Sequence, residues 1–270
     1  MLSFMECQLS KAKKRIVMVT GGAVRLGAAV SEALARAGWG VVIHAHRSRA
    51  EAAALCARLR ASGAEAWHVC GDLAQPGGGA AMFAAACEAA GGLDALVNNA
   101  SVFSTRGAMP EEERRAMWQV NAHEPIALTR HLWEHLRSRG VTGSVVQMLD
   151  QRIATDAQAE TPYVQSKQAL AAFVRTAAAE MAPTLRVNAV APGAVLLPVS
   201  PDAREPAGHF PLGHRPTPAQ VADAVRWLLH ADAVTGQTIF VDSGQHLSGG
   251  FGETAPRSVS FIMTQRATIQ

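Results

Sequence analysis

Three polar side chains in the second half of the sequence have the types and spacing of a proton-transfer site. Tyr163 and Lys167 stand four residues apart, and Asp150 stands thirteen residues before the tyrosine. Thr161 followed by Pro162 is a typical helix start, so Tyr163 and Lys167 are expected on one helical face. A lysine ammonium within a few ångströms stabilises a phenolate, and the pKa of Tyr163 is therefore expected to fall toward the working range.

The carboxylate of Asp150 restricts the substrate. A carbonyl under reduction gathers negative charge on oxygen and needs hydrogen-bond donors, which an ionised aspartate lacks. A nitrogen heterocycle instead offers ring N–H and amino donors, and hydride addition at carbon leaves a ring nitrogen that must be protonated. Asp150 would relay that proton or hold the ring, while Phe103 would stack on the ring and Ser101 would contact it. The alternative role for Asp150 is to cap a loop.

A glycine-rich segment near the N-terminus has the pattern of a dinucleotide-binding turn. VTGGAVRLG at 19–27 follows an apolar run and precedes a segment of helical period. Gly21 and Gly27 allow a sharp turn and a close approach to a pyrophosphate, and the helix start, which includes Leu26, offers N–H groups to an anion. Arg25 replaces a glycine of the usual TGxxxGxG spacing, so a cationic side chain is expected beside the cleft.

The residues at the end of the next apolar run indicate which cofactor binds. HAHRS at 44–48 has no acidic residue where an enzyme that prefers NAD places one to bind the ribose hydroxyl. His46, Arg47 and Ser48 offer a cation and donors that suit a 2′-phosphate, so NADPH is the predicted cofactor. The alternative is a solvated strand end in which Ser48 is an ordinary helix cap.

The elements that must position these side chains follow from the pattern of apolar residues. β-Branched runs alternate with alanine-rich segments of helical period, which is typical of a parallel sheet covered on both faces. The prediction is an α/β protein, a single-domain Rossmann fold over 1–270 with a core at about 14–247 and a C-terminal tail at 248–270. Seven runs are the predicted strands: 15–20, 41–45, 66–70, 95–100, 143–149, 185–191 and 237–242. Helices are expected at 26–37, 50–61, 111–139 and 161–183.

Composition bounds the class of protein. With 270 residues, 49% hydrophobic and 17% charged, the chain suits one globular domain that carries a cleft. A formal net charge of +3 is too diffuse for a nucleic-acid partner, and no apolar run is long enough for a membrane span. Four scattered cysteines fit a reducing cytoplasm. His131 and His135 lack a third ligand nearby, so no metal site is predicted.

Two regions raise further expectations. The stretch from Pro192 to Pro218 is long enough to be a substrate lid, with an irregular loop of no special role as the alternative. The helices at 111–139 and 161–183 carry apolar residues around more than one face, which predicts burial against a partner subunit. The residues concerned are Leu128, Leu132, Trp133, Leu136, Ala171, Phe173 and Val174.

Together these motifs resemble the short-chain dehydrogenase/reductase family over nearly the whole chain. The residues that carry the resemblance, in that family's order and spacing, are the turn at 20–27, Asp72, NNA at 98–100, Asn121, YxxxK at 163–167 and PG at 192–193. Within the family, TGGAVRLG, HAHRS, NNASVF and Asp150 are most similar to pteridine reductases and dihydromonapterin reductases.

The resemblance implies a homotetramer that reduces a pterin ring, such as a dihydropterin or dihydrofolate. It implies that Asn121, Tyr163 and Lys167 form the catalytic network and that Lys167 also binds the nicotinamide ribose. It places Ser101 and Phe103 beside nicotinamide and substrate, and Arg25 near the cofactor phosphate and the pterin. Further cofactor contacts are expected from Asp72, which would accept from the adenine amino group, and from Leu73, Asn99, Ala100, Pro192 and Gly193.

Two other functions stay open. The first is an NADPH-dependent ketoreductase of the same fold that acts on a 3-oxoacyl group or another carbonyl. The second is a nucleotide-sensing or scaffold protein that keeps the cofactor pocket without catalysis. The sequence disfavours the second, because Tyr163, Lys167 and Asn121 are all present.

Overall fold

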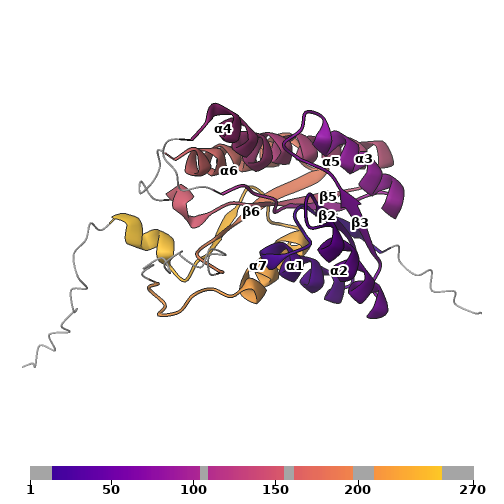
Figure 1. Cartoon of the computed structure of the whole chain (residues 1–270), viewed down its shortest axis with the longest axis horizontal. Coiled ribbons are helices and arrows are strands. Elements are labelled where there is room, and N and C mark those ends of the chain that lie inside the picture. Colours follow the sequence, from indigo (N-terminus) through magenta and orange to yellow (C-terminus); the bar gives the residue numbers. More distant parts are fainter. Residues whose placement is uncertain (1–13, 104–108, 155–160, 197–209, 251–270) are drawn as a thin grey trace, which may run out of the picture.

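The described part of the chain forms one parallel β-sheet between two layers of helices (Figure 1). The computed structural model describes residues 14–103, 109–154, 161–196 and 210–250. The strands are β1 (Ile16–Val19), β2 (Gly40–Ala45), β3 (Ala66–Cys70), β4 (Ala95–Asn98), β5 (Gly143–Met148), β6 (Leu185–Pro192) and β7 (Thr238–Val241). Their order is β3-β2-β1-β4-β5-β6-β7, and every neighbouring pair is parallel. The predicted seven-stranded Rossmann architecture is confirmed.

The helices divide between the two faces of the sheet. They are α1 (Arg25–Arg36), α2 (Arg49–Ala61), α3 (Gly78–Ala90), α4 (Glu111–Trp118), α5 (Glu124–Arg139), α6 (Pro162–Glu180) and α7 (Pro218–His230). In Figure 1, α1, α2 and α7 cover one face, and α3, α4, α5 and α6 cover the other. Successive β-strand residues point to opposite faces, so Val17 packs in the α1/α2/α7 core and Met18 packs in the α3/α5/α6 core. Burial on both faces explains why the strands are continuous apolar runs.

The strand order places a crevice at the carboxyl edge of the sheet. From β1 the chain continues outward through β2 and β3, and then returns to β4 on the other side of β1. In such open sheets, ligands bind where the order reverses, outside the carboxyl ends of the strands. The residues after β1, β2, β4, β5 and β6 all lie at that edge, which is where the sequence analysis placed the candidate site.

The segment at 111–139 differs from its prediction as one continuous helix. A π-helical turn, η1 (Gln119–His123), separates α4 from α5. Asn121 lies in that turn and is fully buried. Single π-turns inside helices often occur at functional sites, because the extra residue redirects a side chain.

The apolar residues used to predict a tetramer are mostly buried within one chain. Leu128, Leu132, Leu136 and Val174 are fully buried in the α3/α5/α6 core, and Phe173 is 9% exposed. Only Trp133 and Ala171 of that group are partly buried. These residues therefore need no partner subunit, and the homotetramer stays a prediction that rests on the resemblance.

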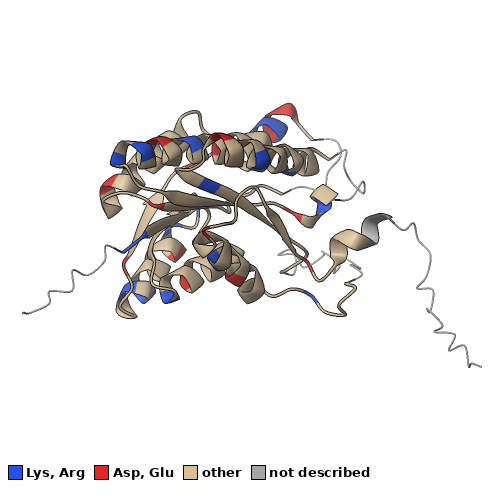
Figure 2. Cartoon of the chain, turned by 180° about the vertical axis from the view of Figure 1, so that it is seen from behind, with Lys and Arg blue, Asp and Glu red and all other residues tan. Residues whose placement is uncertain are grey.

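Charged side chains are interspersed along the helices, as Figure 2 shows. Several form exposed pairs of opposite sign, such as Arg58 with Glu32 and Arg226 with Asp223. No helix within the described ranges is long and apolar enough to cross a membrane. Residues 197–209 of the predicted lid and 251–270 of the predicted tail lie outside the described ranges, so both predictions stay open.

Candidate active site

The glycine-rich turn joins β1 to α1 and has the geometry of a phosphate cradle. Gly21 has φ +60°, a left-handed conformation that glycine adopts without strain. A Cβ at Gly27 would collide with the Gly21 carbonyl oxygen. Only a glycine at position 27 therefore lets the start of α1 pack against the turn. The N-cap residue of α1, Val24, makes no side-chain capping bond, and the first turn carries no acid. The helix start, with half-buried Leu26, thus suits an anion.

Arg25 has an unusual backbone conformation. Its φ is +53°, where a glycine would be unstrained, and its side chain is exposed at the start of α1. A non-glycine residue in this region costs on the order of 1–2 kcal/mol. Strained backbone positions of this kind cluster at functional sites, and the predicted contact of Arg25 with an anionic ligand agrees with that tendency.

A buried histidine that the sequence analysis quoted but did not interpret holds this turn against β2. The N–H of Gly21 donates to Nδ1 of His44 at 3.2 Å, and His44 Nε2 lies 3.1 Å from the carbonyl oxygen of Gly71. Nδ1 therefore accepts and Nε2 donates, which requires a neutral ring. Burial lowers the pKa of His44, in agreement with that assignment.

The end of β2 presents the side chains predicted to bind a 2′-phosphate. His46 and Arg47 are exposed there. Ser48 is the N-cap residue of α2, and its hydroxyl makes no capping hydrogen bond in the described chain, so its role toward a phosphate stays a prediction. His46 Nε2 lies 3.7 Å from Asp72 Oδ2. The end of β2 thus carries a guanidinium and a hydroxyl, and this strand end has no acidic residue of its own.

Asp72 lies after β3 at the same edge. Its carboxylate accepts the N–H of Ala74 at 2.9 Å, and this bond, with smaller contributions from Gln75 and the cations of the β2 end, holds the pKa of Asp72 below its usual value. Leu73, beside it, is buried in the core. Asp72 therefore stays an acceptor at neutral pH, as its predicted contact with an adenine amino group requires.

Asn99 and Ala100 connect the end of β4 to the glycine-rich turn. The Asn99 side chain donates to the carbonyl oxygens of Thr20 and Gly21 at 2.9 and 3.1 Å. The backbone N–H groups of Asn99 and Ala100 both donate to the Thr20 hydroxyl, at 2.9 and 3.0 Å. Asn99 thus acts on the shape of the cofactor turn. Its direct contact with a cofactor stays a prediction.

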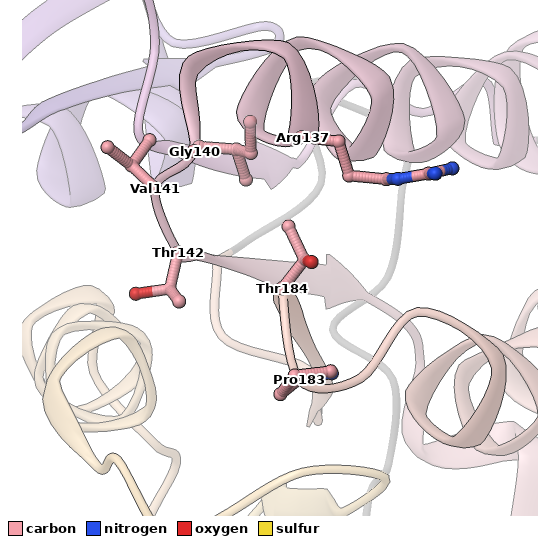
Figure 3. Close-up of a pocket in the computed structure, with 7 residues that line it drawn as sticks. Arg137, Gly140, Val141, Thr142, Pro183 and Thr184 are labelled. Atoms are coloured by element: carbon pink, nitrogen blue, oxygen red, sulfur yellow. The ribbon is translucent and has the colours of Figure 1, made fainter.

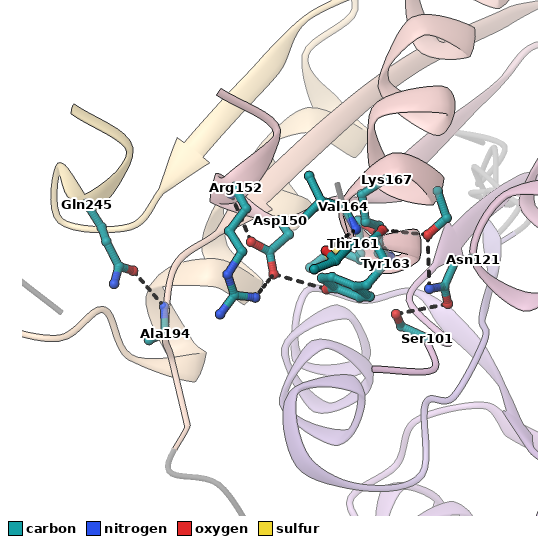
Figure 4. Close-up of polar contacts among 12 residues, drawn as sticks. Ser101, Asn121, Asp150, Arg152, Thr161, Tyr163, Val164, Lys167, Ala194 and Gln245 are labelled. Atoms are coloured by element: carbon teal, nitrogen blue, oxygen red, sulfur yellow. Dashed lines mark hydrogen bonds and ion pairs between the residues drawn. The ribbon is translucent and has the colours of Figure 1, made fainter. Parts of the chain in front are cut away.

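Asn121 links three segments of the site (Figure 4). Its Oδ1 accepts from the Ser101 hydroxyl at 3.1 Å and from the Val102 N–H at 2.8 Å. Its Nδ2 donates to the Val102 carbonyl at 2.9 Å and to the Ser166 hydroxyl at 3.2 Å. Ser166, which the sequence analysis missed, donates in turn to the Tyr163 carbonyl at 2.6 Å. Asn121 therefore fixes the β4 loop against the helix that carries Tyr163.

Tyr163 and Asp150 meet directly. The Tyr163 hydroxyl donates to Oδ2 of Asp150 at 3.0 Å, and the Tyr163 side chain is 7% exposed. Thr161 caps α6 by accepting the Val164 N–H at 3.4 Å, and Pro162 is the first helical residue, as predicted. Burial and then the Asp150 charge raise the pKa of Tyr163 well above its usual value. The predicted lowering of this pKa is wrong in direction, and Tyr163 is a protonated donor at neutral pH.

Lys167 lies one turn further along α6, on the same face as predicted. Its ammonium donates to the carbonyl oxygen of Met148 at 2.8 Å and lies 6.0 Å from the centre of the Tyr163 ring. Burial lowers the pKa of Lys167 to about 8, with the Asp150 charge acting in the opposite sense. A cation in this place can orient a ribose hydroxyl. It does not lower the pKa of Tyr163 below its usual value, because burial and the Asp150 charge raise that pKa.

Titration of Tyr163 can be followed without interference, because it is the only tyrosine. We expect tyrosinate absorbance of the folded protein to stay low at about pH 10, where an ordinary tyrosine is half ionised. Because the pKa of Tyr163 is higher in the folded chain than in the unfolded chain, it contributes to the free energy of unfolding. That contribution is fully present below the unfolded-state pKa and is lost as the pH rises through the folded-state pKa. The urea-unfolded chain is the control. A folded-state midpoint at or below about 10 would contradict the raised pKa.

Arg152 is a site residue that the sequence analysis did not identify. It lies in η2 (Gln151–Ala154), a short 3₁₀ turn directly after Asp150. Its guanidinium lies 3.3 Å from Asp150 Oδ2 and 5.3 Å from the centre of the Phe103 ring. Phe103 is 54% exposed and packs edge-to-face with Tyr163, with ring centres 4.8 Å apart. The order Asp-Gln-Arg was the available signal, since an arginine two residues on can fold back on the aspartate.

The end of β6 completes the edge. Pro192 is the last residue of β6, and a Cβ at Gly193 would approach Asp242 and Gln245 to 2.8 Å. The Ala194 N–H donates to Gln245 Oε1 at 3.0 Å (Figure 4), so the segment after β7 supports the segment after β6. The backbone at Gly193 therefore packs closely against Asp242 and Gln245, and its contact with a cofactor stays a prediction.

A pocket lies away from these residues. A pocket of about 370 Å³ is lined by Leu136, Arg137, Gly140, Val141, Thr142, Pro183 and Thr184 (Figure 3). These residues precede β5 and β6, so the pocket lies at the amino edge of the sheet. Its one charged side chain, Arg137, stacks on Trp133 with 4.9 Å between the guanidinium carbon and the ring centre. Among described residues, no cluster of three or more histidine, cysteine or acidic side chains could hold a metal there or elsewhere.

Comparisons with known proteins match most of the chain. A family described as enoyl-(acyl carrier protein) reductase (adh_short_C2) matches residues 22–246. The 3beta-hydroxysteroid dehydrogenase 1 of Eggerthella lenta is 32% identical over 252 residues, which cover 88% of this chain and 96% of that protein. A granaticin polyketide synthase putative ketoacyl reductase 2 of Streptomyces violaceoruber is 31% identical and covers 86% of this chain and 96% of its own.

Among solved structures, the chain is similar to FolM alternative dihydrofolate reductase 1 from Brucella suis, crystallised in complex with NADP. The identity is 33%, the TM-score is 0.79, and the match covers 89% of this chain and 99% of that one. The matched proteins therefore share the fold and are oxidoreductases, but their names point to steroid, ketoacyl and dihydrofolate substrates.

Proposed function

Because the chain belongs to the short-chain dehydrogenase/reductase family of oxidoreductases, we propose that it reduces a pterin ring, such as a dihydropterin or dihydrofolate, with NADPH. The observation that carries the proposal is the hydrogen bond from Tyr163 to the Asp150 carboxylate beside the exposed face of Phe103. A carboxylate in this place suits a substrate rich in N–H donors and opposes a developing oxyanion. The name of the Brucella suis protein supports the same substrate class.

The residues at the crevice fit NADPH. The glycine cradle at Gly21 and Gly27 and the uncapped start of α1 suit a pyrophosphate, and the end of β2 suits a 2′-phosphate. Lys167 would hold the nicotinamide ribose. When bound, NADPH supplies the hydride that reduces a C=N bond, and the balance requires one proton for the ring nitrogen. Tyr163 is a protonated donor next to Asp150, and the pair supplies that proton while Asp150 accepts from the ring or its amino group.

The runner-up is an NADPH-dependent ketoreductase, which the granaticin ketoacyl reductase and the steroid dehydrogenase favour by name. In that case Tyr163 would protonate an alkoxide while Asp150 opposed its charge. NADPH oxidation with a dihydropterin, dihydrofolate and an acetoacetyl thioester decides between the two. Turnover of the thioester alone would make ketone reduction the function, and turnover of neither class would favour a scaffold.

The end of β2 predicts the cofactor preference. NADPH should bind at least about tenfold more tightly than NADH, a difference of about 1.4 kcal/mol. Arg47→Glu should erase or reverse that preference, because a carboxylate repels a 2′-phosphate. Arg36→Glu makes the same charge change at a side chain that is 72% exposed near the far end of α1, and it should leave the preference intact. Equal affinities of the unaltered protein for both nucleotides in a fluorescence titration would contradict the predicted preference for NADPH.

A further inference from the structure

Arg152 holds both oxygens of the Asp150 carboxylate. Its backbone N–H donates to Oδ1 at 2.9 Å, and its guanidinium Nη1 donates to Oδ2 at 3.3 Å. Both side chains are largely buried, with 26% of Arg152 and 19% of Asp150 exposed. One residue that binds both oxygens fixes the plane of the carboxylate, which a single hydrogen bond cannot do.

The Oδ2 atom of Asp150 also accepts a hydrogen bond from Tyr163, the proposed proton donor. Oδ2 of Asp150 accepts from Arg152 and from the Tyr163 hydroxyl, at 3.3 and 3.0 Å (Figure 4). A carboxylate has about four acceptor positions, and these contacts with the Arg152 N–H use three. Among the contacts within the described residues, one acceptor position of Asp150 is left for a ligand. Its direction depends on the carboxylate plane, and hence on Arg152.

The guanidinium of Arg152 also packs on the surface expected to stack a ring. It lies 5.3 Å from the centre of Phe103, and Phe103 lies edge-to-face on Tyr163. Asp150, Arg152, Phe103 and Tyr163 thus form a closed set in which each member contacts the next. Arginine suits this place because its planar cation both stacks on an aromatic ring and donates to a carboxylate.

We propose that Arg152 is a positioning residue that sets the orientation of Asp150, and with it the proton path from Tyr163 and the fit of an N–H-rich ring. This inference rests on the proposed function, since the ring is the ligand for which the orientation matters. Arg152 acts through Asp150 and Phe103. Its own cation is not the group that binds the substrate.

The first test is a pair of substitutions at Arg152. Arg152→Met keeps the length and removes the charge, and it should lower kcat for a dihydropterin about tenfold or more, because a hydrogen bond to a charged group is lost. KM and NADPH affinity should stay within about threefold. Arg152→Lys keeps the charge without the planar stack, so its kcat should lie between those of Arg152→Met and the unaltered enzyme. Arg226→Met, in the exposed pair with Asp223 on α7, is the matched control and should change nothing.

A double-mutant cycle separates positioning from a general structural effect. In an Asp150→Asn background, Arg152→Met should change the single-turnover rate by less than about twofold, because the group it positions is gone. Independent, multiplicative losses in the two variants would overturn the proposal. Thermal unfolding of each variant checks folding, and the Lys variant keeps the test valid if the Met variant is unstable.

A second substrate separates positioning from direct binding of an anion. Dihydrofolate carries carboxylates and a simple dihydropterin carries none, so positioning predicts the same loss of kcat for both after Arg152→Met. A rise in KM confined to dihydrofolate would make Arg152 a substrate-binding cation and would overturn the inference while leaving the proposed function intact. Failure of the unaltered enzyme to reduce either pterin would instead refute the proposed function and this inference with it.

Discussion

Tyr163→Phe is expected to lower turnover of a dihydropterin by about a hundredfold or more, because positioned acid–base groups contribute about 10²–10⁴ in rate. The substitution removes the hydroxyl that donates to Asp150 at 3.0 Å and keeps the ring that packs against Phe103. The pKa of Tyr163 is raised, so the hydroxyl carries its proton at neutral pH, and phenylalanine has no proton to give.

The variant should fold and bind cofactor normally. Arg152 still contacts both oxygens of Asp150, so the carboxylate keeps partners, and the loss of one hydrogen bond costs about 1 kcal/mol. NADPH affinity should change by less than about threefold, because Lys167 is held by the Met148 carbonyl and not by the Tyr163 hydroxyl. Single-turnover rates and a cofactor titration measure both quantities. Turnover that stays within about threefold of the unaltered enzyme would remove Tyr163 from the proton path.

The sheet could be predicted because the burial of each strand is visible in its own sequence as an apolar run. The run 66–70 is β3 without a shifted residue, and the helix predicted at 161–183 is α6, Pro162–Glu180. Strands buried on both faces are continuous apolar runs, and the Thr161 cap is a local signal. The carboxyl edge then follows from the order of strands and helices, which brings Gly21, Asn99 and Asp150 together without knowledge of their contacts.

The features that the sequence did not reveal depend on contacts between distant segments. The π-turn at Asn121 is supported by its bonds to Val102 and Ser166, and no local period marks it. The same reasoning explains the error in the direction of the Tyr163 pKa. The burial of Tyr163 and the approach of Asp150 are tertiary facts, and both raise the pKa of Tyr163. The sequence analysis expected Leu132 to face a partner subunit, because its burial in the α3/α5/α6 core cannot be read from its own helix.

Asp150→Ser should change the rates of reduction of two substrates in opposite directions. Reduction of a dihydropterin should fall by about two to four orders of magnitude, because the change removes the proton relay or the acceptor that orients the ring. Any activity on a simple ketone should stay level or rise, because a hydroxyl donor replaces a charge that opposes the developing oxyanion. The pKa of Tyr163 should also fall, since the Asp150 charge is one of the causes that raise it.

The local turn should survive this change, which makes the two rates interpretable. A serine hydroxyl can accept the Arg152 N–H that now donates to Oδ1, as serine does in comparable turns. Asp223→Ser is the matched control, because it removes a carboxylate from an exposed pair with Arg226 on α7 and should alter neither rate. If Asp150→Ser leaves dihydropterin turnover within about threefold, the carboxylate only shapes its loop. The argument from charge development then fails, and ketone reduction becomes the better account of an arrangement in which Tyr163 alone faces the substrate.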